Sequence, residues 1–109
     1  LRDVQSDMRV ARDELFGPVL PILAFDDEEA VLAAANDTSY GLAAYVFTTG
    51  LARALRAGEV LQAGSVCVNE AHYGVHLPHA GQKQSGLGCD RSHYSLEEYL
   101  SLKRVSIRK

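Results

Sequence analysis

The stretch LAAYVFTTGLARALRAGEVLQAGSVCVN, residues 42–69, decides the fold. Its first part, Leu42–Thr48, and its last part, Ser65–Asn69, are apolar runs rich in residues that favour strands. Between them, Leu51–Leu61 has apolar residues at helical spacing. That stripe consists of Leu51, Ala54, Leu55, Gly58 and Leu61. Two strands joined through a helix by short turns predict parallel pairing, and therefore an α/β fold.

Another strand and helix are predicted before this stretch. Val19–Phe25 is an almost continuous apolar run, which is typical of a strand covered on both faces. Pro21 places this strand at an edge or a bulge, because proline has no N–H for the ladder. Asp26 begins a helix that ends at Asn36, and Glu29 gives it the spacing of a capping box. The whole order predicts a βαβαβ piece of a parallel sheet.

Two glycines in and after the second helix are given local roles. Gly58 would allow the helix to pack closely on the sheet, since it has no side chain. Gly64 would close the helix as its C-terminal glycine.

The C-terminal part is predicted to hold a long loop, a helix and a strand. Glu70–Asp90 is a loop of about 20 residues, a length that is usually functional or disordered. Ser92–Leu100 follows as a final helix, with Ser95 and Glu98 as a second capping pair. Val105–Arg108 alternates in polarity and predicts a terminal strand.

Composition excludes several classes of protein. The 109 residues carry a net charge of −3, so we expect no nucleic-acid partner and no attraction to an anionic membrane. No apolar run approaches the length of a membrane span. Cys67 and Cys89 have no metal-ligand spacing, Cys67 is expected to be a buried thiol, and a cytoplasmic location is the default. The first residue is Leu1 rather than Met, which indicates the interior of a longer chain.

Residue chemistry alone offers no complete catalytic set. His72 and His76 have a spacing that would suit zinc on a helix, but Gly74 and Pro78 make a helix there unfavourable. Ser85, His79 and Asp90 are the residue types of a catalytic triad, but a triad is defined by its geometry and not by residue types alone.

Glu14 is the strongest single candidate from residue chemistry. It precedes Phe16 and the break at Gly17-Pro18, so its carboxylate would lie beside an aromatic face. The alternative is an ordinary surface acid.

Four separated motifs resemble the NAD(P)-dependent aldehyde dehydrogenase superfamily. Met8–Val19 resembles the segment E-E-[IL]-F-G-P-V, and Asn36–Ala44 is similar to A-N-x-[ST]-x-Y-G-L-A-A. Ala63–Asn69 is similar to A-G-[ST]-V-W-[VI]-N, and Leu77–Gly88 resembles P-[FHW]-G-G-x-K-x-S-G-x-G. The motifs occur in the family's order and cover nearly the whole chain.

The resemblance implies the C-terminal part of a longer aldehyde dehydrogenase. Residues 1–101 would belong to its catalytic domain and residues 102–109 would form an oligomerisation strand. The complete enzyme would oxidise an aldehyde to a carboxylic acid with NAD or NADP, through a cysteine thiohemiacetal and a thioester. The nucleophile, the general base and the cofactor domain would lie upstream, so this chain alone would be inactive. Its partners would be the aldehyde, the rest of its own chain, and further copies in a homo-dimer or homo-tetramer. The alternative is a truncated remnant or an oligomerisation module without catalysis.

The resemblance also assigns roles to individual residues. Glu14 matches the carboxylate that binds the nicotinamide ribose, and Phe16 matches the aromatic residue near the nicotinamide. Tyr73, Gly74, Val75 and His79 fall on the loop of the aldehyde pocket.

Further assignments concern the loop after the third strand and the end of the chain. Lys83 and Gly86 match positions whose backbone carbonyls bind a monovalent cation, and Asp90 stands where a proton-relay glutamate is found. Leu102–Arg108 resembles the strand that pairs across subunits. Cys67 departs from the family's Trp, while the run Pro-His-x-Gly-Gln-Lys is more like aminobutyraldehyde and betaine aldehyde dehydrogenases.

Overall fold

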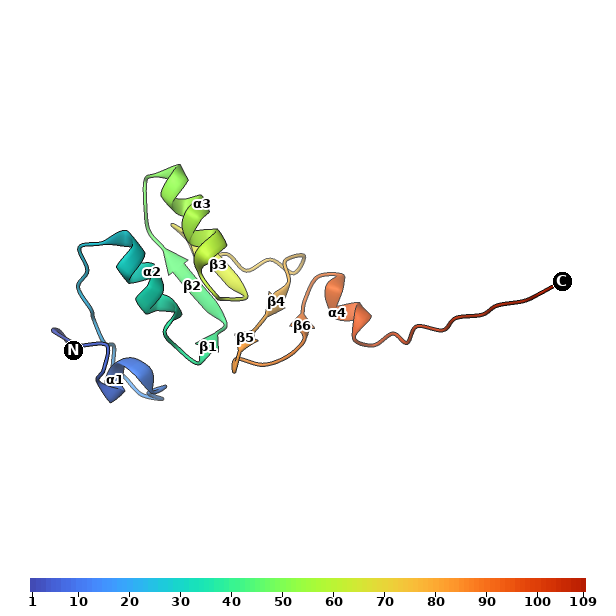
Figure 1. Ribbon diagram of the computed structural model, residues 1–109, viewed down its shortest axis with the longest axis horizontal. Coiled ribbons are helices and arrows are strands. Elements are labelled where there is room, and N and C mark those ends of the chain that lie inside the picture. Colours follow the sequence, from blue (N-terminus) through green and yellow to red (C-terminus); the bar gives the residue numbers. More distant parts are fainter.

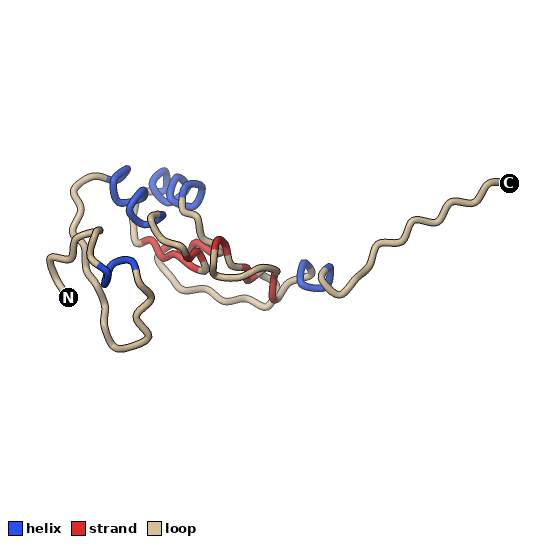
Figure 2. Tube along the Cα trace, turned by 60° about the horizontal axis from the view of Figure 1, so that its bottom comes forward, coloured by secondary structure: helices blue, strands red, loops and turns tan.

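A parallel βαβ unit forms the centre of the molecule. In the computed structural model, which describes all 109 residues, β2 (Ala43–Val46) pairs with β3 (Ser65–Val68) through the intervening helix α3 (Leu51–Val60). The two strands run parallel, in a register that starts at Ala43↔Ser65 and ends at Val46↔Val68. The parallel pairing predicted for residues 42–69 is therefore confirmed. Figure 2 shows α2 and α3 together on one side of these strands.

The face of α3 that packs on the sheet differs from the predicted stripe. Ala57 is only 2 % exposed, with Ala54 and Leu61 half-buried beside it, whereas Leu51 and Leu55 are 73 % and 61 % exposed. The small alanine side chains let the helix lie close to the strands, and the two leucines then point outward. Gly58 was wrongly assigned to close packing, because a Cβ there would meet nothing within 4 Å.

Gly64 is needed for a close approach rather than for the end of a helix. The last turn of α3 is closed by the Leu61 N–H, which donates to the Ala57 carbonyl at 3.0 Å. A Cβ on Gly64 would lie 1.6 Å from the carbonyl oxygen of Ala80, which is backbone and has little freedom to move.

We expect Gly64→Ala to destabilise the complete protein by about 1–3 kcal/mol, the usual effect of overpacking. Gly58→Ala is the matched control and should stabilise it by about 0.5–1 kcal/mol, since alanine is the better helix residue. Urea unfolding of both variants measures the difference. Equal stability of the two variants would contradict the close contact with Ala80.

The first predicted strand does not form. Val19–Phe25 has no regular secondary structure. The Leu1 amine donates to the Leu20 carbonyl at 2.8 Å, the Ile22 N–H donates to the Leu1 carbonyl at 2.9 Å, and the Val19 N–H donates to the nearby Gly17 carbonyl at 2.8 Å. The apolar side chains of this run are largely exposed, Phe25 at 62 %. A strand requires a neighbour along its length, and none lies beside this segment. The sheet is therefore βαβ rather than βαβαβ.

Two short helices precede the central unit. α1 spans Arg9–Arg12 and α2 spans Glu28–Asn36. The cap of α2 is Asp27, whose Oδ1 accepts from the Ala30 N–H at 2.7 Å, so the predicted cap at Asp26 was one residue early. The predicted end of this helix at Asn36 is confirmed.

The long loop holds three short strands. β5 (Gln82–Lys83) pairs antiparallel with β1 (Tyr40–Gly41), and β4 (His79–Ala80) pairs antiparallel with β6 (Cys89–Asp90). These pairs are two residues long and have no periodicity that a sequence could display. The β1–β5 pair holds the segment after β3 against the turn before β2, and the β4–β6 pair closes that segment on itself.

The end of the chain is extended. α4 covers only Tyr94–Glu97, and the Ser95–Glu98 capping pair was wrong, because Glu98 instead accepts a hydrogen bond from the Cys89 N–H. The terminal strand predicted at Val105–Arg108 does not form, since nothing lies beside it. Figure 1 shows this segment running away from the rest of the molecule.

Little of the chain is enclosed. Only Val4, Gly41 and Ala57 are buried, and Cys67, expected in the core, is half-buried. The radius of gyration is 18.5 Å, whereas a compact domain of about 100 residues has about 13 Å. The exposed apolar surface is therefore available to other protein segments. None of the helices is long and apolar enough to cross a lipid bilayer.

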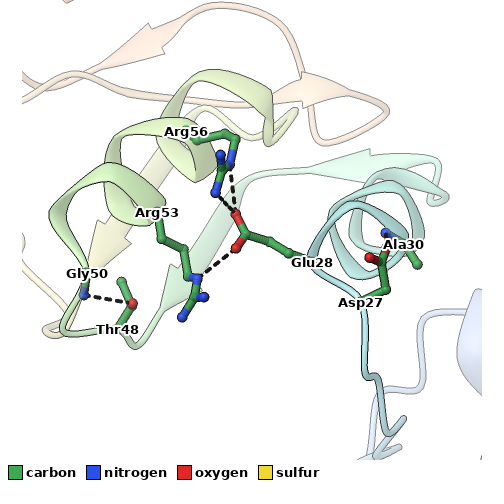
Figure 3. Close-up of polar contacts among 7 residues, drawn as sticks. All are labelled: Asp27, Glu28, Ala30, Thr48, Gly50, Arg53 and Arg56. Atoms are coloured by element: carbon green, nitrogen blue, oxygen red, sulfur yellow. Dashed lines mark hydrogen bonds and ion pairs between the residues drawn. The ribbon is translucent and has the colours of Figure 1, made fainter.

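One carboxylate joins α2 to α3. Glu28 Oε2 accepts from Arg53 Nε at 2.7 Å, and Glu28 Oε1 accepts from Arg56 Nε at 2.7 Å and from Arg56 Nη2 (Figure 3). The Glu28 side chain is 27 % exposed. Hydrogen bonds from Arg53 and then Arg56 lower the pKa of Glu28 below its ordinary value of 4.5.

We expect Glu28→Gln to destabilise the complete protein at neutral pH. Because the folded-state pKa is lowered, the contribution is present above pH 4.5 and is lost as the pH falls through the folded-state pKa. The difference in free energy of unfolding between wild type and variant should therefore shrink in acid. Urea titrations at several pH values measure it, with Glu59→Gln, an exposed acid on α3, as the control. A difference that stays constant down to pH 3 would contradict this role.

Candidate functional site

Glu14 lies on a cleft that distant parts of the chain share. The cleft has a volume of about 320 Å³, and its lining includes Glu14, Thr38, Tyr40, Gly41 and Ser85. The side chain of Glu14 is exposed and makes no ion pair within the chain. We call this the Glu14 cleft. It brings the first sequence motif into one site with the second and the fourth.

The wall of the Glu14 cleft is held by backbone and side-chain hydrogen bonds. The Gly41 N–H donates to Ser85 Oγ at 2.9 Å, and the Gln84 N–H donates to the Ser39 carbonyl at 2.9 Å. The β1–β5 pair lies between these two bonds. The loop that contains Ser85 is thereby fixed against the turn at residues 37–41.

Phe16 is not part of this cleft. Its side chain is 98 % exposed and is absent from the residues that line the cleft. The segment after it is irregular, so no element of the chain holds the ring against Glu14.

A second cleft, of about 330 Å³, lies along β2 and β3 and is bordered by the segment that follows β3. Its lining includes Tyr45, Cys67, Tyr73, His79 and Arg91, and we call it the tyrosine cleft. Gly74 also lines it, whereas Val75 is 85 % exposed and does not. Three of the four residues predicted for an aldehyde pocket thus lie together.

Aromatic and cationic contacts organise the tyrosine cleft. The hydroxyls of Tyr45 and Tyr73 are 2.7 Å apart, and this hydrogen bond raises the pKa of Tyr45 above its ordinary value of 10.0. The Tyr73 and His79 rings meet edge to face, with centroids 6.5 Å apart. The Arg91 guanidinium carbon lies 5.6 Å from the centre of the Tyr73 ring, a cation–π distance.

Sequence reasoning missed Tyr45 and Arg91. The signal for Tyr45 is its register, since it lies opposite Cys67 in the parallel pair. The sequence alone does not determine which residues face each other across β2 and β3. Arg91 adopts a φ of 63°, an uncommon conformation for this residue type, and directly follows β6.

The remaining predicted residues lie on the segment between the two clefts. Gly86, with φ of 122°, and Asp90 border a third cleft of about 540 Å³. The Asp90 Oδ1 accepts from the neighbouring Arg91 N–H at 2.8 Å. The Lys83 side chain is turned away from these residues and toward the end of α2, where its Nζ donates to the carbonyls of Asn36 and Thr38 at 2.7 and 3.0 Å. No three His, Cys, Asp or Glu side chains gather at one point where they could hold a metal ion.

A parallel βαβ unit with clefts beside its strands is typical of α/β proteins. The model of the aldehyde dehydrogenase family matches residues 1–105, and the chain belongs to this family.

Individual relatives agree with this assignment. The chain is 49 % identical over 107 residues to an aldehyde dehydrogenase of Enchytraeus buchholzi, covering 97 % of this chain and 22 % of that protein. It is 49 % identical over 106 residues to a betaine aldehyde dehydrogenase of Agrobacterium fabrum, covering 96 % and 22 %. The crystal structure of the indole-3-acetaldehyde dehydrogenase AldA of P. syringae, in complex with NAD+ and IAA, is similar with a TM-score of 0.89. It is 46 % identical, and the match covers 94 % of this chain and 21 % of that one. The chain therefore spans about a fifth of the length of the relatives it matches.

Proposed function

We propose that these 109 residues form part of an enzyme that oxidises an aldehyde to a carboxylic acid with NAD or NADP. Family membership supports this, and a similar protein binds NAD+. The observation that carries the proposal is the Glu14 cleft, where the first and fourth family motifs meet. The cysteine that would form the thiohemiacetal and the thioester belongs to the rest of the chain.

Glu14 is the proposed ligand of the nicotinamide ribose. A carboxylate accepts from two vicinal hydroxyls at once, and charge-assisted hydrogen bonds are about twice as strong as neutral ones. Its exposed, unpaired carboxylate fits this acceptor role. Glu14 would hold the dinucleotide there, where it would supply the acceptor for the hydride that leaves the thiohemiacetal carbon. Phe16 would pack near the nicotinamide once the rest of the chain orders the segment that carries it.

The tyrosine cleft is the proposed aldehyde pocket. Tyr73, Gly74 and His79 would line it, with Tyr45 and Arg91 as added members and Val75 at its outer margin. The hydroxyl pair and the edge-to-face rings would hold these walls in one arrangement before substrate arrives. The predicted likeness to betaine aldehyde dehydrogenases is confirmed by the 49 % identity to the Agrobacterium fabrum protein.

Three further assignments also stay predictions. The backbone carbonyls of Lys83 and Gly86 would hold a monovalent cation, and Asp90 would relay protons near the pocket. A cytoplasmic location is likewise a prediction.

The second candidate function is an oligomerisation module, favoured by the extended end of the chain. Leu102, Val105 and Ile107 are exposed there at 105 %, 72 % and 84 %. Residues 102–109 would add a strand to another copy in a homo-dimer or homo-tetramer, while residues 1–101 belong to the catalytic domain. An exposed backbone edge is suited to such pairing.

An activity assay of the complete protein tests the proposal. The protein is supplied with NAD+ or NADP+ and a panel of cationic, neutral and anionic aldehydes, and absorbance at 340 nm follows cofactor reduction. We expect reduction that depends on the aldehyde. Absence of reduction with every aldehyde, in a protein that is folded and oligomeric, would favour the module without catalysis.

A further inference from the structure

The Lys83 ammonium adds a donor at the C-terminal end of α2, where the Asn36 carbonyl also accepts from the Thr38 N–H at 2.9 Å. α2 has no basic residue in its own last turn, and the last carbonyls of a helix lack partners within it. Lys83 Nζ donates to the Asn36 carbonyl at 2.7 Å and to the Thr38 carbonyl at 3.0 Å. A cation at the C-terminal end of a helix is also favoured by the helix dipole. A residue 45 or more positions away in the chain thereby caps the helix.

The backbone at Lys83 turns its side chain in this direction. Its φ is 54°, in the left-handed region that glycine adopts most readily and that costs other residues free energy. Glycine at this position would remove that cost, whereas other substitutions would keep it.

The same contact reaches both helices that cover the sheet. The Asn36 side chain donates from Nδ2 to the Val60 carbonyl at 2.9 Å and accepts at Oδ1 from the Gln62 N–H at 2.8 Å. Asn36 thus joins the end of α2 to the end of α3, and Lys83 joins the loop to Asn36.

Three of these residues stand at the Glu14 cleft. Asn36, Thr38 and Gln62 line it together with Glu14 and Ser85. The two hydrogen bonds that Lys83 donates therefore add to the Gly41–Ser85 and Ser39–Gln84 contacts that hold this wall.

We propose that Lys83 is a positioning residue for the dinucleotide: its ammonium fixes the turn at residues 36–41 at the distance from Glu14 that the ribose requires. This rests on the proposed function. The tyrosine cleft has no lining residue in this set, so the effect should fall on the dinucleotide rather than on the aldehyde.

Three variants of the complete enzyme test the role. Lys83→Met keeps the length of the side chain without the donors, Lys83→Arg keeps donors and charge, and Lys83→Gly removes the side chain but relieves the left-handed backbone. Isothermal titration calorimetry measures the Kd of NAD+ and NADP+. Steady-state kinetics give KM for the aldehyde, and thermal unfolding gives Tm.

We expect the dinucleotide Kd to rise about tenfold, or about 1.4 kcal/mol, in Lys83→Met and Lys83→Gly, and about twofold in Lys83→Arg. The aldehyde KM should stay within about twofold of wild type. Arg2→Met, an exposed cation remote from both clefts, should change none of these values. Lys83→Gly should keep a higher Tm than Lys83→Met, because it relieves the backbone, and so remains testable if the Met variant unfolds.

Two results would overturn the proposal. The first is a dinucleotide Kd within about twofold of wild type in both Met and Gly variants. The second is an equal rise in the aldehyde KM, which would mean a general structural effect. A wild-type enzyme that binds no dinucleotide would instead refute the proposed function.

Discussion

Glu14→Gln in the complete enzyme should lower kcat/KM about tenfold to a hundredfold. Glutamine keeps the shape of the side chain but loses the charge and one of the two acceptors. Hydrogen bonds to a charged group contribute about 1.5–3 kcal/mol, which corresponds to this range of rates. Stopped-flow measurement of cofactor reduction would separate hydride transfer from product release.

Glu59→Gln is the matched control for this change. Glu59 is exposed on α3 and lines none of the clefts described above, so its variant should keep wild-type kinetics. Unchanged turnover in Glu14→Gln, with the protein folded, would refute the role of Glu14. A loss of turnover shared by Glu59→Gln would indicate a general effect of removing negative charge.

Removal of residues 102–109 should convert the complete enzyme to a smaller assembly. Each fully buried Val, Ile or Leu side chain contributes about 1.5–3 kcal/mol. If Leu102, Val105 and Ile107 are buried at a subunit contact, their removal should raise the Kd of subunit association more than about a hundredfold. Light scattering coupled to size-exclusion chromatography measures the mass.

A length-preserving variant sharpens this test. Val105→Ser with Ile107→Ser should have the same effect as the deletion, whereas Arg108→Ser should leave the mass unchanged. An unchanged mass in both the deletion and the double variant would contradict an oligomerisation strand in this segment.

The sequence predicted the parts of the fold whose periodicity is local. The strands and helix of residues 42–69 carry their own pattern, and their parallel pairing follows from the short connections. Val19–Phe25 and Val105–Arg108 also carry strand patterns, but a strand forms only where a neighbour offers hydrogen bonds. Val105–Arg108 has no such neighbour, and Val19–Phe25 meets only Leu1 as a distant partner.

The site was predictable only where a motif carries it. Glu14 was a candidate from residue chemistry, and the family resemblance gave roles to it and to Tyr73 and His79. The structure places these residues in clefts. Tyr45 and Arg91 were missed because their positions depend on register and on an uncommon backbone conformation. The side chain of Lys83 points to carbonyls far away in the chain, a contact that local spacing does not encode.

A crystal structure of the complete enzyme with NAD+ or NADP+ tests the central claim most directly. We expect both Glu14 carboxylate oxygens within about 2.5–3.2 Å of the nicotinamide ribose hydroxyls, and Lys83 Nζ still on the carbonyls of Asn36 and Thr38. A ribose bound elsewhere, with Glu14 facing solvent, would contradict the account.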